Sequence, residues 1–219
     1  MINITRTTYN KIEEYSRAMK GKEIGGLLIG KIVEDNSTKG LHNIIVTNAI
    51  ILKQKKTSTS FDIDDDAMME FTKNASDKTL SSIIGWWHTH GYGGLFWSIV
   101  DDECSKRIVN MSGFNIGIVT TVPFWRPMNV LCRIEVRDQK GRIISTDDAA
   151  IYIDDEDNST TTKVSKKEII EDIEQNVRED KEEEVTEEYL KEMSELDEYL
   201  NNDGENDKES RLQKTIITD

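Results

Sequence analysis

Apolar residues along the first 150 positions follow two different spacings. Between Tyr9 and Met19 they recur every three or four residues with charged residues between them, which predicts a short amphipathic helix. Runs rich in Ile, Leu and Val at 25–33 and 44–52 are typical of buried strands, and we expect these two strands to pair as neighbours. The same patterns predict helices at 64–72 and 99–111, and strands at 82–90, 115–122, 130–137 and 142–145.

The order of these elements predicts the class of fold. Helices and strands are mixed without strict alternation, so the pattern indicates a mixed α/β domain, or an α+β domain, with one sheet flanked by helices. We expect this domain to span residues 1–153. The following stretch, 154–164, is polar and of low complexity, as expected of a solvated linker.

A second patterned region lies beyond this linker, at residues 165–201. Two apolar stripes at helical spacing predict an acidic, amphipathic helical extension. The stripes consist of Ile169, Ile170, Ile173 and Val177, and of Val185, Tyr189, Met193, Leu196 and Leu200. They are narrow and heavily flanked by charge, so they fit docking against the domain or a partner as well as a loosely ordered segment. We expect residues 202–219 to be disordered.

The net charge of -14 is concentrated in the last third of the chain. Residues 151–219 carry 24 acidic and 9 basic side chains, whereas residues 1–150 carry 18 and 19. Binding to a phosphate backbone needs clustered Lys and Arg, so we expect no nucleic-acid partner. Neither a signal-like start nor a window of 18 apolar residues is present, so we expect a soluble, cytoplasmic protein without a membrane partner. Cys104 and Cys132 lack metal-ligand or redox spacing and are expected to be reduced core residues.

Two of the three histidines, His88 and His90, lie two residues apart at the end of a predicted strand. Side chains at i and i+2 of a strand point to the same face, so the two imidazoles can converge on one cation. A catalytic zinc site usually has three protein ligands and one open position, so a third ligand, naturally a carboxylate, is needed. The third histidine, His42, is expected in a loop or at a strand edge, and Trp86 and Trp87 in the core.

A carboxylate with suitable placement follows in the sequence. Ser98 and Asp101 open a predicted helix, three residues apart and on one helix face, after a glycine-containing turn. We expect Asp101 to be the third ligand and Ser98 to hydrogen-bond the reacting water or the developing oxyanion. The same pair fits a capping box that satisfies N–H groups at a helix start, and capping and catalysis are compatible.

A glycine-rich apolar segment precedes these motifs: Lys22-Glu23-Ile24-Gly25-Gly26-Leu27-Leu28-Ile29-Gly30. With His88-Thr-His90, Ser98 and Asp101, this segment resembles the JAMM, or MPN-plus, metalloproteases of the JAB domain class. The resemblance covers roughly residues 5–150 and includes Phe61-Asp62-Ile63-Asp64, which is similar to the stretch leading into the family's middle helix. It implies a cytidine-deaminase-like α/β fold with a central, mostly antiparallel sheet.

The resemblance also implies a role for each residue of the motif. His88, His90 and Asp101 would ligate Zn²⁺, Glu23 would act as general base and acid, and Ser98 would assist the tetrahedral intermediate. Without the resemblance, Glu23 is an ordinary surface carboxylate between a helix and a strand. The implied activity is that of a zinc-dependent isopeptidase that removes ubiquitin-like modifiers from conjugated proteins.

Two other functions stay open at this point. The chain could be a processing peptidase that trims a small sulfur-carrier or ubiquitin-like precursor at its C-terminus. It could also be a non-catalytic MPN scaffold, although such members of the family typically lack the metal ligands. Members in larger assemblies pair through MPN domains and C-terminal helices, so the resemblance further implies a homodimer, or an MPN or helical partner.

Two features near the histidines need the structure to interpret them. Gly91 stands where the family very often has proline, from which we expect a looser loop. The apolar stretch Leu95-Phe96-Trp97 fits equally well as the lining of a substrate groove and as packing beneath the loop.

Overall fold

The computed structural model describes residues 2–19, 21–34, 42–57, 59–91, 94–123, 126–154 and 164–179. The helices in these residues are α1 (Arg6–Ala18), α2 (Asp65–Asn74), α3 (Asp77–Ser81), α4 (Ile99–Ser112) and α5 (Lys166–Asn176). The strands are β1 (Ile2–Thr5), β2 (Gly25–Glu34), β3 (His42–Ile50), β4 (Gln54–Lys56), β5 (Phe61–Ile63), β6 (Ile83–Thr89), β7 (Phe114–Thr121), β8 (Asn129–Arg137), β9 (Ile143–Thr146), β10 (Ile151–Asp154) and β11 (Val177–Glu179). No helix in these residues is long and apolar enough to cross a lipid bilayer.

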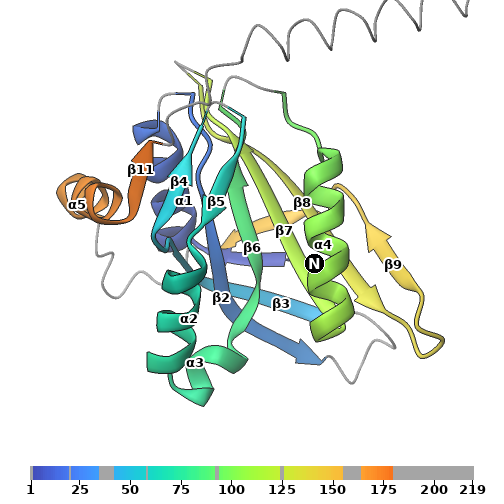
Figure 1. The fold of residues 1–219 in the computed structure, drawn as a ribbon. Coiled ribbons are helices and arrows are strands. Elements are labelled where there is room, and N and C mark those ends of the chain that lie inside the picture. The colour runs from blue at the N-terminus through green and yellow to red at the C-terminus, as the bar shows by residue number, and fades with distance from the viewer. Residues whose placement is uncertain are drawn as a thin grey trace, which may run out of the picture. The chain divides into compact units, whose positions relative to one another are not determined.

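A large sheet forms the centre of the fold (Figure 1). Its strands, within the described residues, number 8 and follow the order β10-β1-β3-β2-β6-β7-β8-β9. β6 runs parallel to β7, and β1 runs parallel to both β3 and β10, whereas the remaining neighbours are antiparallel. The predictions of a mixed α/β fold with a mostly antiparallel sheet, and of pairing between β2 and β3, are confirmed.

Helix α1 covers one face of this sheet. The hydroxyl of Thr5 accepts a hydrogen bond from the backbone N–H of Thr8, so the helix begins earlier than the apolar spacing alone predicts. Ile12 and Tyr15 share one helix face and are fully buried. The Tyr15 ring stacks on Trp87 of β6, with 5.6 Å between ring centroids. The expected core position of Trp87 is therefore confirmed.

Helix α4 lies on the opposite face, across β7 and β8 (Figure 1). Its buried residues, Asp101, Ser105 and Val109, recur every four positions and form one stripe toward the sheet. Since successive strand side chains point to opposite faces, His88 faces α4 while its neighbour Trp87 faces α1. The side chains of β6 therefore alternate between the apolar layer beneath α1 and the layer beneath α4, which contains Asp101.

A second, 3-stranded sheet in the described residues has the order β11-β4-β5. It joins the segment after α5 to the β4–β5 hairpin, because β11 pairs in parallel with β4. Ile169 of α5 belongs to the hydrophobic core, and the Tyr15 hydroxyl donates a hydrogen bond to Asp172 of the same helix. Of the first apolar stripe, Ile169 and Ile173 of α5 therefore pack against the core, whereas Ile170 is 49% exposed and Val177 lies in β11 and not in the predicted helix. The second stripe lies outside the described residues, as do 155–163 and 202–219.

Several short strands have no counterpart among the predicted elements. Strands β4, β5 and β11 have three residues each, and β1 and β10 have four, too few for a period-2 pattern to emerge. Their positions depend on pairing with strands distant in sequence, such as β1 with β10. The elements predicted within residues 1–153 are all present, with boundaries that differ by a few residues.

Candidate metal centre

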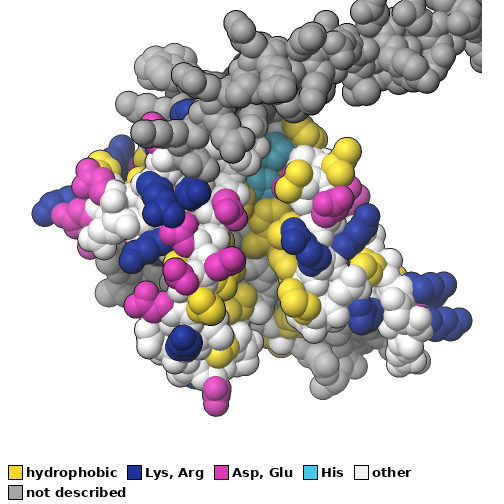
Figure 2. Space-filling model, viewed as in Figure 1, with side chains coloured by type: hydrophobic (Ala, Val, Ile, Leu, Met, Phe, Trp, Pro, Cys, Tyr) yellow, Lys and Arg dark blue, Asp and Glu magenta, His cyan; other side chains and the backbone are white. Residues whose placement is uncertain are grey.

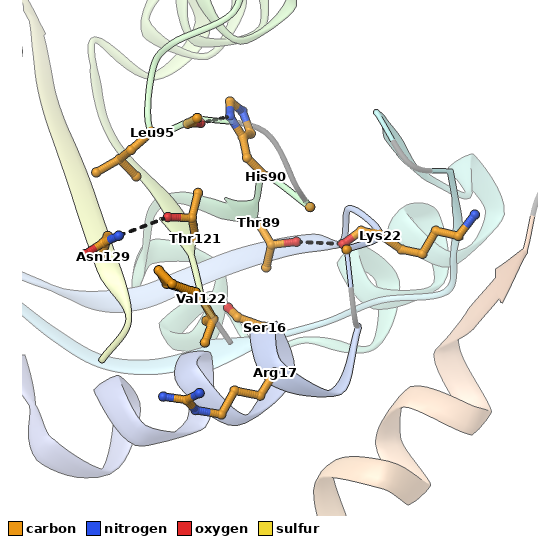
Figure 3. A pocket seen from close by; sticks show the side chains of 13 residues that line it. Ser16, Arg17, Lys22, Thr89, His90, Leu95, Thr121, Val122 and Asn129 are labelled. Atoms are coloured by element: carbon orange, nitrogen blue, oxygen red, sulfur yellow. Dashed lines mark hydrogen bonds between the residues drawn. The ribbon is translucent and has the colours of Figure 1, made fainter. Parts of the chain in front are cut away.

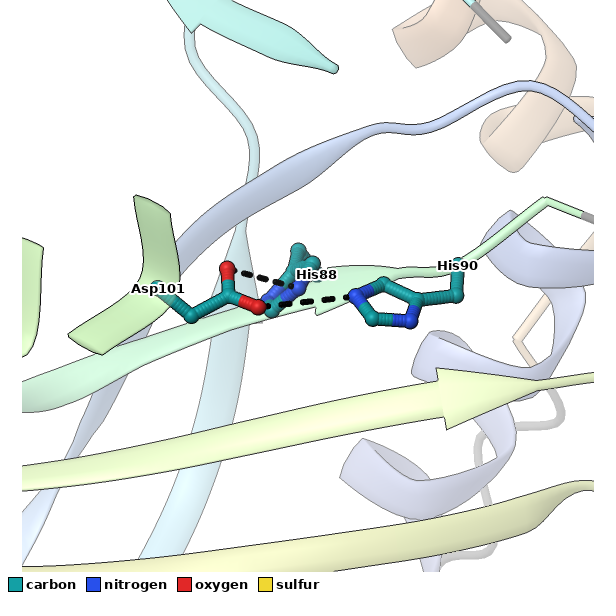
Figure 4. A group of neighbouring side chains, drawn as sticks. All are labelled: His88, His90 and Asp101. Carbon is teal, nitrogen blue, oxygen red and sulfur yellow. Dashed lines mark ion pairs between the residues drawn. The ribbon is translucent and has the colours of Figure 1, made fainter. Parts of the chain in front are cut away.

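Three buried side chains converge where β6 ends and α4 begins. His88 Nε2 lies 3.2 Å from Asp101 Oδ1, and His90 Nε2 lies 3.6 Å from Asp101 Oδ2 (Figure 4). All three residues are buried, and their ligand atoms lie within 4.8 Å of one another. The strand supplies two imidazoles on one face, and the first turn of the helix supplies the carboxylate.

The geometry of these contacts fits a bound cation. Ligand atoms at the distances typical of tetrahedral zinc lie about 3.3 Å apart, close to the spacing between His88 Nε2 and Asp101 Oδ1. Neither ring nitrogen of His88 has a hydrogen-bond partner among the described residues, although the side chain is only 1% exposed. A buried polar atom without a partner costs free energy, and a metal ion at this point would satisfy Nε2. Two imidazoles and a carboxylate suit zinc and other divalent transition metals.

The loop after β6 orients the second imidazole. His90 Nδ1 lies 2.9 Å from the carbonyl oxygen of Gly94, which can only accept a hydrogen bond. The proton of the neutral ring is therefore held on Nδ1, and the lone pair of Nε2 faces Asp101. This arrangement is the one that a metal-ligating histidine needs.

Asp101 is oriented by its own helix. The Ser98 backbone N–H donates to Asp101 Oδ2 at 2.7 Å, and the Asp101 backbone N–H donates to the Ser98 hydroxyl at 3.2 Å. This reciprocal pair is a capping box, so the capping interpretation of the two residues is confirmed. Capping also turns the other oxygen, Oδ1, toward His88. One motif therefore starts the helix and orients the carboxylate.

The protonation equilibria of the three residues favour metal binding at neutral pH. Burial lowers the pKa of His88, which keeps the ring neutral. Burial alone would raise the pKa of Asp101, but its contacts with the two histidines hold that pKa well below the usual range. Burial opposes protonation of His90 as well, yet the Asp101 contact leaves its pKa raised. A proton on His90 therefore competes with a cation as the pH falls.

Glu23 lies close enough to this cluster to respond to its charges. Burial raises the pKa of Glu23 to about 7, with His90 lowering it and the Asp101 carboxylate raising it. The backbone around Glu23 is held by Thr89, the residue between the two histidines: its hydroxyl donates to the Lys22 carbonyl at 3.1 Å and accepts from the Ile24 N–H at 3.2 Å. The strand that carries the ligands therefore also positions the carboxyl group.

A close backbone contact fixes the same loop from the other side. Gly91 packs so tightly against Gly21 that a Cβ atom added at Gly91 would fall 1.9 Å from the Gly21 carbonyl oxygen. Gly21 itself has φ of 88°, a conformation that favours glycine. The missing side chain at position 91 therefore permits the segments before Glu23 and after His90 to touch, whereas the looser loop expected there stays a prediction.

Two hollows open beside the cluster. A groove of about 840 Å³ runs between Met68 of α2 and Ile108 of α4, and Trp86, which stacks on His88 with 4.7 Å between centroids, belongs to its floor. Figure 2 shows this apolar hollow leading toward the histidine side chains. A second cavity of about 730 Å³ is lined by His90 and by polar residues that include Arg17 and Asn129 (Figure 3). The second cavity therefore reaches a candidate ligand, His90, whereas the groove approaches the cluster through Trp86.

The apolar stretch after the histidines divides between the two roles considered for it. Leu95 and Phe96 are exposed, and Leu95 lines the second cavity. Trp97 packs beneath the loop, since its ring lies against Gly117 of β7, where a Cβ atom would fall 2.7 Å from the ring. Leu95 therefore lines a cavity and Trp97 packs against the sheet, whereas a substrate role for this stretch stays a prediction.

Sequence reasoning missed the residues that hold the site together. Thr89 and Gln54 were not recognised, although both are buried and hydrogen-bonded to the segment that carries Glu23. The Gln54 side-chain amide bonds both the N–H and the carbonyl of Gly25, at 3.0 and 2.8 Å. A hydroxyl residue between two candidate ligands was the only available signal for Thr89, and Gln54 had none.

Comparisons with known proteins give one family match. The family model described as JAB1/Mov34/MPN/PAD-1 ubiquitin protease matches residues 2–112, a range that contains Glu23, both histidines, Ser98 and Asp101. No curated protein matches the chain. Among solved structures, the solution structure of protein DSY2949 from Desulfitobacterium hafniense is similar, with 14% sequence identity and a TM-score of 0.47 over 70% of this chain and 93% of that chain.

Proposed function

Because the chain belongs to the JAB family, we propose that it is a zinc-dependent peptidase that releases a ubiquitin-like modifier by hydrolysing the amide bond after its C-terminus. The bond would be an isopeptide bond to a lysine side chain. The observation that carries the proposal is the cluster of His88, His90 and Asp101 with Glu23 beside it. A purely structural MPN scaffold needs no such set of converging, partly unsatisfied ligand atoms.

The three ligand residues would hold Zn²⁺ and leave one position open for chemistry. A zinc ion bound there would supply Lewis acidity toward a carbonyl group and would acidify water. The protein's part is to keep the ligands in place, which the capping box does for Asp101 and the Gly94 carbonyl does for His90. This support lowers the cost of ordering the ligands when the ion binds.

Glu23 is proposed as the general base and acid. With a pKa of about 7, its carboxyl group can accept a proton from the attacking water and later return it to the leaving amine near neutral pH. The backbone on both sides of Glu23 is held by hydrogen bonds of Lys22 and Ile24 to Thr89. Such pKa matching is typical of catalytic carboxyl groups in partly buried sites.

Ser98 is proposed to stabilise the developing oxyanion. Its hydroxyl oxygen accepts the hydrogen bond from the Asp101 N–H, and the same side chain hydrogen-bonds the Asp101 carboxyl group, so the O–H would have to turn from that carboxylate to donate to an oxyanion. The helix start already fixes the hydroxyl oxygen, so this turn of the O–H is the reorganisation that the reaction would need. Capping and catalysis are thus compatible functions of the same group.

The apolar groove supports an extended peptide as the substrate segment. Strand β5 ends the small sheet, so within the described residues one of its edges carries no paired strand. Phe61 of β5 stacks on His88 at 5.9 Å, and the groove floor at Trp86 stacks on the same imidazole. An extended chain can pair with such an edge while its side chains occupy apolar pockets. The flexible C-terminus of a modifier has this form.

The proposal is tested by cleavage of modifier fusions with the full-length protein. We expect Glu23→Gln to lower turnover by about 100- to 10,000-fold while the bound zinc is retained. Glu171→Gln is the matched control, because Glu171 is an exposed residue of α5 whose carboxylate lies 3.4 Å from Lys167 and which lines neither hollow. Full activity in zinc-loaded Glu23→Gln would contradict the assigned base.

The choice of substrate separates the remaining alternatives. Isopeptide-linked and linear fusions of the same modifier should be compared, with zinc content measured in each sample. Cleavage of linear fusions alone would favour processing of a precursor over removal from conjugates. Zinc-loaded protein that cleaves neither kind of substrate would support the scaffold function.

A further inference from the structure

Helix α4 contributes one metal ligand from its first turn, so the position of that turn relative to the sheet decides the shape of the site. The capping box fixes Asp101 to its own helix but not to β6. Something must tie the start of α4 to the sheet that carries the histidines. The side chain with the most suitable contacts is Arg133 of β8.

Arg133 makes two short ion pairs and is almost fully buried. Its Nη1 donates to Asp102 Oδ1 at 2.5 Å, and its Nε donates to Asp147 Oδ1 at 2.5 Å. The residue is only 7% exposed, whereas both carboxylates are partly exposed. Asp102 directly follows the candidate ligand Asp101, so this pair anchors the backbone of the first turn to β8.

The same guanidinium group holds the residue before the helix. Its carbon lies 4.4 Å from the centre of the Trp97 ring, a cation–π contact in a mostly buried setting. Trp97 lies against Gly117 of β7, and its ring centroid is 6.4 Å from that of His88. Arg133 therefore contacts the residues immediately outside both ends of the segment from Ser98 to Asp101.

We propose that Arg133 is a positioning residue of the metal centre, which fixes the Asp101 carboxylate opposite the two imidazoles by holding Trp97 and Asp102. A planar guanidinium group suits this task because it can stack on a ring and bond two carboxylates at once. The inference rests on the metal site and does not require the proposed peptidase activity. Groups outside the ligands commonly change metal affinity when they orient a ligand.

A second arginine on the same strand provides a matched control. Arg137 Nη2 donates to the side-chain carbonyl of Asn110, near the other end of α4. Arg133 and Arg137 thus both connect β8 to this helix, but only the first lies beside the turn that carries Asp101. Loss of either arginine side chain would loosen α4 in general. Only loss of the Arg133 side chain would misplace the Asp101 carboxylate.

The experiment measures Zn²⁺ affinity by chelator competition in the full-length protein, beside the thermal unfolding of each metal-free variant. We expect Arg133→Gln to weaken zinc binding by about 10- to 100-fold, and Arg137→Gln by less than about 2-fold. Arg133→Lys keeps the positive charge but loses the planar guanidinium group. Its zinc affinity should therefore lie between the affinities of Arg133→Gln and Arg137→Gln. Asp102→Asn, at a partly exposed carboxylate, tests the anchor with little risk to folding and should weaken binding more than Arg137→Gln does.

Unchanged zinc affinity in Arg133→Gln would overturn the inference and leave the metal site and the proposed function standing. Equal losses in Arg133→Gln and Arg137→Gln, following equal losses of stability, would also overturn it. Wild-type protein that takes up no zinc would overturn the proposed function as well, so the two failures are distinguishable. Weaker binding confined to the Arg133 and Asp102 variants would support it.

Discussion

Strand β6 separates two environments that differ in polarity. On the α1 face, Trp87 is fully buried and stacks on Tyr15 within the main core. On the α4 face, His88 is just as buried, but neither of its nitrogens has a hydrogen-bond partner among the described residues. Trp87 Nε1 also has no hydrogen-bond partner among the described residues, but it lies in an apolar core, whereas two imidazoles and a carboxylate are buried together on the α4 face.

This difference indicates that the α1 face stabilises the fold and that the α4 face carries the candidate site. Burying apolar surface on the α1 face stabilises the domain in proportion to the area removed from water. Burying imidazole and carboxylate groups on the α4 face costs desolvation free energy, which contacts within the cluster offset only in part. A metal ion would offset that cost, so the two faces should respond differently to substitution.

The largest effect on folding is expected from the apolar face. Trp87→Ala should lower the free energy of unfolding by about 3–5 kcal/mol, because it leaves a cavity against Tyr15. Denaturant unfolding of the metal-free protein measures this. Trp87→Phe keeps an aromatic ring in place and should cost much less. A small effect of Trp87→Ala would show that the α1 face is not the main source of stability.

Substitutions on the α4 face should weaken metal binding more than they lower the stability of the fold. His88→Ala should weaken zinc binding by more than about 100-fold, which exceeds the usual effect of groups outside the ligands. Its metal-free form should be destabilised less than Trp87→Ala, because the substitution also removes two buried nitrogens without described partners. Zinc content and unfolding of both variants give the comparison, with His42→Ala as the control histidine. Retention of stoichiometric zinc in His88→Ala would refute the ligand set.

A smaller effect should follow from separating the two loops that meet beside the metal centre. Gly91→Ala places a Cβ atom against the Gly21 carbonyl oxygen and should cost about 1–3 kcal/mol of stability. Because Glu23 follows Gly21 closely, turnover should fall more than zinc affinity does. Gly141→Ala is the control, since its φ of 78° makes alanine unfavourable there while its Cβ atom would meet no atom within 4 Å. Equal behaviour of the two variants would argue against the role of the contact.

The smallest effect concerns pH in the metal-free protein. The pKa of Glu23 is raised by burial from 4.5 to about 7, so between these pH values the folded protein holds a proton that the unfolded chain releases. Stability from this group is present at low pH and is lost as the pH rises through that window. Partial exposure of Glu23 reduces the size of the effect. Wild type should therefore lose stability relative to Glu23→Gln from about pH 4.5 to about pH 7, and parallel pH profiles would contradict this.

Much of the fold was predictable because its long elements carry regular patterns. The helix at 99–111 and the strand at 82–90 have enough residues for their spacing to identify them, and both are present as α4 and β6. The first apolar stripe of the extension was recognised as helical, but its place against Tyr15 and the core was not predictable. Docking depends on the surface that another part of the chain presents, and no local pattern encodes that surface.

The sequence by itself determined the candidate ligands, since the spacing of His88, His90 and Asp101 puts two residues on one strand face and the third in a helix turn. Only the tertiary structure decided what holds them: Thr89 bonds a carbonyl 67 positions away, Gly91 touches Gly21, and Arg133 lies between Trp97 and Asp102. Short-range motifs are fixed by backbone periodicity. Contacts between distant segments depend on how the whole sheet pairs and packs, so they are known only when the chain is folded.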